Sequence, residues 1–118
     1  MNRYYLVEPE RVVADDLAEA IRAFDPAAVV EVFSGVAELV TALTLARPNA
    51  VILSLDPQGF ADTASGRALT DEGIPHAFLC AGGSDLPEGA AILASPFSEA
   101  TVGALLARLA AAEGGRDG

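Results

Sequence analysis

The sequence predicts a doubly wound α/β domain in which five parallel strands alternate with helices. Short, β-branched apolar runs recur five times along the 118 residues, and segments with apolar residues at helical spacing separate them. The run at 50–55 is the most continuous, as expected of a central parallel strand covered on both faces. This alternation predicts a parallel sheet with helices on both sides.

The first half of the chain contains two of these strands and two helices. Residues 4–7 form a short apolar run, and the helical spacing that follows ends at Asp25-Pro26. Residues 29–33 are rich in valine and predict the second strand. Ser34 comes directly after this strand, and we expect its side chain to cap the next helix.

The second half of the chain contains a weaker helix, predicted over 62–72, because Gly66 in its middle lowers the helix propensity. Two more strands are predicted at 77–80 and 90–93. The segment 81–89 between them is too rich in Gly and Pro for a full helix. We therefore expect the fourth helix to be shortened or missing.

The last helix is predicted to follow Ser98 and to bury a leucine-rich face. Its other faces carry small side chains that a partner or a second copy of the chain can cover, so a homodimer is one expectation. These small residues are Ala104, Ala107, Ala110 and Ala111. We expect a single domain over 1–112 and a disordered tail over 113–118.

The composition excludes several classes of function. The formal net charge is -10, with 17 acidic residues against seven arginines and no lysine. A chain of this charge lacks the basic patch that nucleic-acid binding needs, and an anionic membrane surface repels it. No apolar run approaches the roughly 20 residues that cross a bilayer. A single cysteine fits a reducing compartment, so we expect a cytoplasmic protein.

The polar residues at the predicted strand ends are the first candidates for function. In doubly wound folds, ligands bind beyond the carboxyl ends of the strands. The candidates there are Glu8, Pro9, Glu10, Ser34, Ser54, Asp56, Cys80 and Ser95.

Four segments at these strand ends resemble the CheY-like receiver domain of bacterial response regulators. Residues 6–10, Leu-Val-Glu-Pro-Glu, resemble its acidic first-strand motif, and residues 51–56 resemble the strand that carries its phosphoacceptor aspartate. Residues 78–81 resemble the strand with the switch Ser or Thr, and 93–97 resemble the Lys-Pro-Phe segment. The resemblance covers residues 3–112 and implies a flavodoxin-like (βα)5 domain with strand order 2-1-3-4-5.

This sequence departs from the family where the resemblance implies phosphoryl chemistry. Ser54 replaces the nucleophilic aspartate, and no His of the chain is placed to serve as its base. Ser95 replaces the lysine that stabilises phosphoryl charge. Cys80 replaces the switch hydroxyl, and Pro9 replaces the second acidic residue of the first strand. We therefore predict no phosphorylation cycle, no catalytic residue and no enzymatic activity. The degenerate positions are Glu8, Pro9, Ser54, Asp56, Cys80 and Ser95.

Two kinds of residual chemistry are conceivable at these positions. Glu8, Glu10 and Asp56 are oxygen donors able to hold Mg²⁺ or Ca²⁺, but so few carboxylates rarely hold Mg²⁺ without a substrate phosphate. A solvated acidic rim is therefore the favoured interpretation, and no metal or other cofactor is predicted. Cys80 has no cation nearby in sequence to lower its pKa, so an inert thiol is favoured over a reactive one.

The resulting hypothesis is a stand-alone pseudo-receiver in bacterial two-component signal transduction. It acts by protein–protein interaction independent of phosphorylation, and a histidine kinase or phosphotransfer protein of a phosphorelay is its expected partner. The resemblance implies docking through the first helix and adjoining strand ends. The predicted contact residues are Val12, Asp16, Glu19, Pro57, Pro96 and Phe97. The alternative is a small-molecule or metal-binding flavodoxin-like sensor, although no phosphate loop follows the first strand.

Overall fold

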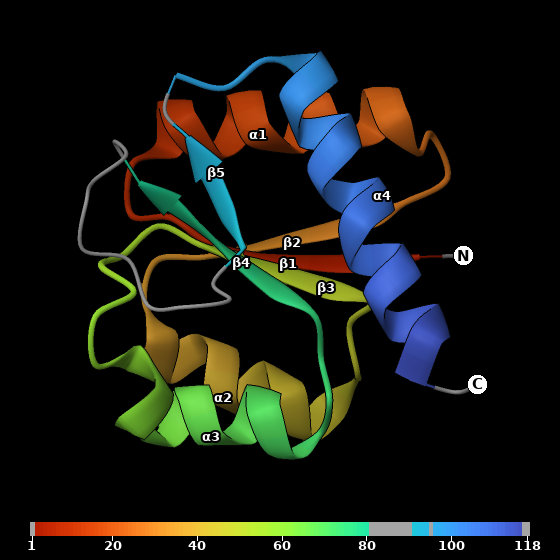
Figure 1. The fold of residues 1–118 in the computed structure, drawn as a ribbon. Coiled ribbons are helices and arrows are strands. Elements are labelled where there is room, and N and C mark those ends of the chain that lie inside the picture. Colours follow the sequence, from red (N-terminus) through yellow and green to blue (C-terminus); the bar gives the residue numbers. More distant parts are fainter. Residues whose placement is uncertain (1, 81–90, 95, 117–118) are drawn as a thin grey trace.

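Five strands form one parallel sheet in the order β2-β1-β3-β4-β5 (Figure 1). The computed structural model describes residues 2–80, 91–94 and 96–116. The strands are β1 (Arg3–Val7), β2 (Val29–Phe33), β3 (Ala50–Leu53), β4 (His76–Cys80) and β5 (Ile92–Ala94). The predicted fold class and strand order are confirmed.

Four α-helices cover the two faces of this sheet in the described part of the chain. They are α1 (Arg11–Phe24), α2 (Val36–Leu45), α3 (Ala64–Asp71) and α4 (Glu99–Arg116), and a short 3-10 helix, η1 (Phe60–Asp62), precedes α3. Figure 1 shows α1 and α4 on one face and α2 and α3 on the other. The β4–β5 connection, where a shortened or missing helix was predicted, lies outside the described residues. None of the described helices has the length and apolar character that a bilayer span requires.

Alternate residues of the strands enter two separate hydrophobic cores. In β1, Leu6 packs under α1 and α4, whereas Val7 packs under α2 and α3. All four residues of β3 are buried, because this central strand is covered on both faces. The apolar run that predicted β3 therefore reflects burial on both sides of the sheet.

The register places the ends of β1 and β3 side by side. Val7 pairs with Leu53 of β3 and with Phe33 of β2. The hydrogen bonds continue one residue further, since Glu8 N–H donates to Phe33 O at 2.9 Å and Ser54 N–H donates to Val7 O at 2.8 Å. Glu8 and Ser54 thus follow neighbouring strands at the carboxyl edge of the sheet.

The predicted cap at Ser34 is wrong. Helix α2 begins one residue later than expected, with Gly35 at the N-cap position and no side-chain cap. Gly35 continues the extended backbone, so Ser34 lies too early to reach the N–H groups of the first turn. Its hydroxyl instead donates to a carboxylate oxygen of Glu38 at 3.3 Å.

Ser98 does cap the last helix. Its hydroxyl accepts a hydrogen bond from Thr101 N–H at 3.2 Å, and Thr101 Oγ1 accepts one from Ser98 N–H at 2.8 Å. The helix continues to Arg116, so residues 113–116, predicted as part of a disordered tail, are helical. Extending an existing alanine-rich helix needs no new nucleation, which accounts for the longer α4. Residues 117–118 lie outside the described residues.

Helix α3 begins at Ala64, two residues after the predicted start, and ends at Asp71. The preceding 3-10 turn brings Thr63 to its N-cap position. Thr63 Oγ1 accepts from Gly66 N–H at 3.1 Å and donates to Phe60 O at 2.6 Å. The cap therefore compensates for the low helix propensity of this short segment.

Candidate functional site

The carboxyl edge of the sheet brings Glu8 and Ser54 together, as the sequence predicted. Glu8 has only 6% of its surface exposed, and its carboxylate accepts the N–H of Glu10 at 2.9 Å. This bond closes the turn between β1 and α1. Pro9 and Glu10, the next two residues, are exposed.

Ser54 is half-buried at the end of β3, and its hydroxyl makes no hydrogen bond with any other described residue. The carboxylate of the neighbouring Glu8 is engaged by Glu10 N–H. The only histidine of the sequence, His76, opens β4, and it pairs in register with Val51, three residues before Ser54. The Nδ1 atom of His76 lies 3.0 Å from Ile74 O. Its ring packs against those of Phe60 and Phe78, and no hydrogen bond joins it to Ser54 among the described residues, so it is not placed to activate the serine hydroxyl.

Asp56 is exposed and is engaged within its own turn. Its Oδ1 atom accepts the N–H of Gln58 at 2.9 Å, a local turn that aspartate commonly forms. Within the described ranges, no group of three His, Cys, Asp or Glu side chains is arranged to hold a metal ion. The Mg²⁺ that the family resemblance implies does not fit these residues, since Glu8 and Asp56 each bind a backbone N–H and Pro9 offers no side-chain ligand.

Cys80 ends β4 and is a free, half-buried cysteine. It pairs in register with Ala94 of β5, next to the position of Ser95 in the sequence. Ser95 itself lies outside the described residues.

A groove of about 410 Å³ lies between α1 and the segment that leads into α4. Four of the predicted contact residues line it: Asp16, Glu19, Pro96 and Phe97. Val12 is 73% exposed but does not line the groove. Pro57 is buried, which argues against a direct contact between this residue and a partner. Its carbonyl oxygen accepts Phe60 N–H at 3.2 Å in a turn that folds the proline inward.

A second hollow, of about 380 Å³, lies further along the same two helices and was not predicted. It is lined by Ala23, Phe24, Glu99, Ala100, Gly103 and Ala104. Phe24 is 46% exposed, and a Cβ atom at Gly103 would lie 3.1 Å from its ring. A glycine inside an otherwise alanine-rich helix was the sequence signal for this close approach.

Solved structures similar to this one are bacterial response regulators. The response regulator PhyR from Brucella abortus shares 21% identity with a TM-score of 0.76, over 98% of this chain and 50% of its own. The beryllofluoride-activated conformation of SdrG from Pseudomonas melonis Fr1 shares 26% identity with a TM-score of 0.73, over 92% of this chain and 95% of its own. An atypical orphan response regulator, described as revealing a phosphorylation-independent regulatory mechanism, shares 13% identity with a TM-score of 0.67, over 94% of each chain.

The chain has the CheY-like receiver fold. The similarity to SdrG covers nearly the whole of both chains and supports a receiver domain of a signalling protein. The chain spans about half the length of PhyR. No protein-family model and no curated protein matches the sequence.

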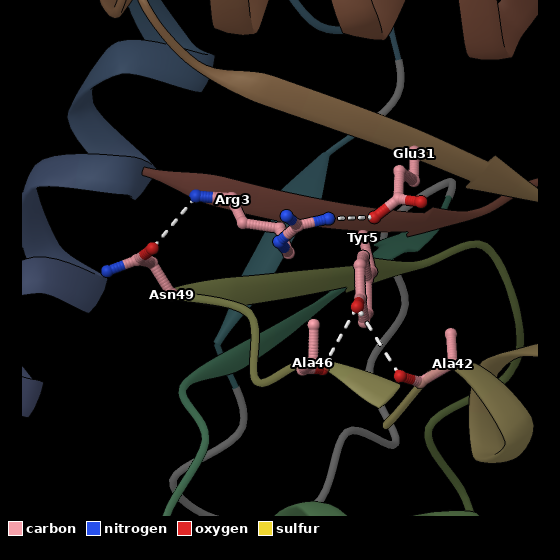
Figure 2. Close-up of polar contacts among 6 residues, drawn as sticks. All are labelled: Arg3, Tyr5, Glu31, Ala42, Ala46 and Asn49. Carbon is pink, nitrogen blue, oxygen red and sulfur yellow. Dashed lines mark hydrogen bonds and ion pairs between the residues drawn. The ribbon is translucent and has the colours of Figure 1, made fainter. Parts of the chain in front are cut away.

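At the opposite edge of the receiver fold, two tyrosines of β1 are held by polar contacts. Burial raises the pKa of the Tyr5 phenol, the Glu31 carboxylate raises it further, and Arg3 opposes this. Burial likewise raises the pKa of Tyr4, with a smaller contribution from Asp25. Figure 2 shows Tyr5 pointing at the end of α2, beside the Arg3–Glu31 ion pair. These groups belong to the scaffold of the receiver fold, because they lie at the amino-terminal edge of the sheet.

Proposed function

We propose that this receiver domain acts by binding a protein partner of bacterial two-component signalling without being phosphorylated. The observation that carries the proposal is the position of Ser54, which follows β3 beside the buried Glu8. The family resemblance places the phosphoacceptor aspartate there. The proposed partner is a histidine kinase or a phosphotransfer protein.

The surroundings of Ser54 support the loss of phosphoryl transfer. A neutral hydroxyl needs a base to act as a nucleophile. His76 opens β4 with Nδ1 at 3.0 Å from Ile74 O, and the Glu8 carboxylate is engaged by Glu10 N–H. The chain contains no lysine, so the ammonium group that would balance phosphoryl charge is missing from the sequence. Asp56 is held in its own turn by Gln58 N–H. These features together argue against an aspartyl-phosphate or seryl-phosphate cycle.

The receiver fold is compatible with such a mode of action. The atypical orphan regulator of the same fold is described as having a phosphorylation-independent mechanism. For this chain we propose that contact is made through the groove lined by Asp16, Glu19, Pro96 and Phe97. The exposed Val12 lies on the same helix, α1, and extends this surface.

Amide chemical shifts recorded by NMR during a titration with Mg²⁺ and beryllofluoride test the loss of phosphorylation. We expect no saturable shifts at Glu8, Ser54 or Cys80, because beryllofluoride needs a carboxylate to mimic an acyl phosphate. SdrG, which adopts a beryllofluoride-activated conformation, is the positive control under the same conditions. Saturable shifts at those three residues would overturn the proposal.

Binding to purified kinase dimerisation domains and phosphotransfer proteins from the source organism tests the second half of the proposal. We expect at least one of them to bind with the same affinity in the presence and absence of a small phosphodonor. An affinity that appears only with the phosphodonor would contradict it. A small molecule retained by the protein in native mass spectrometry, with no protein bound, would instead support the alternative of a sensor domain.

A further inference from the structure

The groove between α1 and the start of α4 combines an apolar floor with an acidic rim. Val13 and Phe97 in its floor pack against the core that α1 and α4 share, and Ala20 belongs to that core. Asp16 and Glu19 of α1 line one side of the groove. Glu99, the first residue of α4, contributes a third carboxylate.

These three carboxylates are exposed and make no hydrogen bond or ion pair with any other described residue. Asp16 and Glu19 are three residues apart on one helix, a spacing at which like charges repel. The first-turn position of Glu99 is favoured by the helix dipole, but its charge adds to the same negative field. The net charge of -10 strengthens this field.

The charge of the groove selects among occupants. In a symmetric dimer through this surface, the three carboxylates of one copy would face the same carboxylates of the other. A nucleic acid or an anionic metabolite meets the same repulsion. A partner segment with cationic side chains instead neutralises the rim, and an apolar side chain on that segment can cover Val13 and Phe97.

We infer that the groove receives a partner segment in which an apolar side chain is flanked by at least two arginines or lysines. This inference rests on the proposed function, since it describes the contact face of the protein partner. The carboxylates steer and orient the cationic segment, and the apolar floor provides the surface that is buried on binding.

Two matched sets of substitutions test this inference. The groove variant is Asp16→Asn/Glu19→Gln/Glu99→Gln. The control variant is Asp62→Asn/Asp71→Asn/Glu72→Gln, which removes three exposed carboxylates from η1 and the end of α3, on the opposite face of the sheet (Figure 1). Both variants change the net charge by the same amount, so they separate contact in the groove from the overall field.

The probe is a synthetic helical peptide with one leucine flanked by arginines at helical spacing, compared with the same peptide carrying glutamates. In titrations at low salt, the arginine peptide is expected to shift the amide NMR signals of Val13, Ala20 and Phe97. The groove variant is expected to bind it about tenfold more weakly, and the control variant less than about twofold more weakly. The glutamate peptide is expected not to bind.

Three results would overturn the inference: equal weakening in both variants, equal binding of the two peptides, or no binding of the arginine peptide to the unmodified protein. Circular dichroism confirms that the variants are folded, which is expected because all six positions are exposed. A kinase or phosphotransfer domain that binds the groove variant as tightly as the unmodified protein would refute the cationic groove and leave the proposed function intact. Beryllofluoride-induced shifts at Ser54 would refute the proposed function without bearing on the peptide result.

Discussion

Gly66 of α3 packs directly against the backbone of Phe60: a Cβ atom at Gly66 would lie 2.1 Å from the Phe60 carbonyl oxygen. The same Cβ atom would lie 2.9 Å from Ala61 Cα. Both obstacles are backbone atoms of the 3-10 turn that precedes the helix, so no rotamer change can relieve the clash. The glycine that weakened the predicted helix is therefore what allows η1 and α3 to pack together.

Replacement of this glycine is expected to destabilise the fold. In Gly66→Ala the higher helix propensity of alanine contributes about 1 kcal/mol in favour of the helix. Separating η1 from α3 to make room for the Cβ atom costs more than this gain, so we expect the free energy of unfolding to fall by about 1–3 kcal/mol. The free energy of unfolding from urea denaturation measures it, and an unchanged midpoint would show that the turn can move away at no cost.

Gly103→Ala is the matched control, and the opposite sign is expected. Its Cβ atom would meet the ring of Phe24 at 3.1 Å, but that side chain is 46% exposed and can rotate outward. The gain in helix propensity then prevails, and we expect the free energy of unfolding to rise by up to about 1 kcal/mol. A marked loss in the same urea experiment would show that Phe24 is held rigidly against α4.

Tyr5→Phe removes a hydrogen bond that joins β1 to the C-terminal end of α2. The phenol donates to Ala46 O at 2.9 Å, with a longer contact to Ala42 O at 3.5 Å (Figure 2). We expect the free energy of unfolding to fall by about 1 kcal/mol, because Ala46 O loses its donor. The Tyr5 side chain beside it is almost fully buried. Tyr4→Phe is the control and should lose less, since its contacts with Asn2 and Asp25 are 3.3 and 3.4 Å. Equal losses in thermal denaturation would contradict this ranking.

Alkaline pH is expected to destabilise the fold through the same two tyrosines. The pKa values of Tyr4 and Tyr5 are raised in the folded state, mainly by burial, so the unfolded chain releases these protons first. Their contribution to stability is complete below the ordinary pKa of 10.0 and is lost as the pH rises through the raised values. Urea midpoints measured between neutral and strongly alkaline pH should fall above that point. In the double variant Tyr4→Phe/Tyr5→Phe the urea midpoint should fall less over the same pH range. An equal fall in the double variant would show that other groups cause the alkaline destabilisation.

Millimolar Mg²⁺ is expected to leave the thermal midpoint of the protein unchanged. A ligand that binds only the folded state stabilises it by mass action, and the residues at the carboxyl edge do not fit this ion. Glu8, the buried acid there, accepts the N–H of Glu10 instead. Differential scanning calorimetry with and without Mg²⁺ checks this, with the same addition of Na⁺ salt as the ionic-strength control. A rise in midpoint that Glu8→Gln abolishes would establish a metal site.

The fold class could be predicted from the sequence because strands buried on both faces consist of continuous apolar residues. The run at 50–53 is apolar throughout since β3 is covered by helices on both sides. Helix α1 shows apolar spacing because one face packs on the sheet, and its buried residues include Leu17 and Ile21. The adjacency of Glu8 and Ser54 was predictable for a related reason, as parallel strands end at the same edge.

Other features depended on contacts between segments far apart in the chain. Pro57 looked like an exposed turn residue, but the turn that leads into Phe60 buries it. Ser34 had the residue type of a cap, yet one more extended residue moved it out of reach of the helix. Such details depend on backbone path, which local composition describes poorly.

The sequence by itself therefore determined the order of the elements, the layers and the residues at the carboxyl edge, because periodicity and burial are properties of single segments. Only the tertiary structure decided which residues share a surface. The groove joins Asp16 and Glu19 to Phe97 and Glu99, about 80 residues later in the chain, through the packing of α1 beside α4. The tertiary structure also showed why position 66 is a glycine, since any Cβ atom there would clash with the carbonyl oxygen of Phe60. Both results arise from close packing between elements. The space available to a side chain depends on neighbouring elements that lie outside its own segment of the sequence.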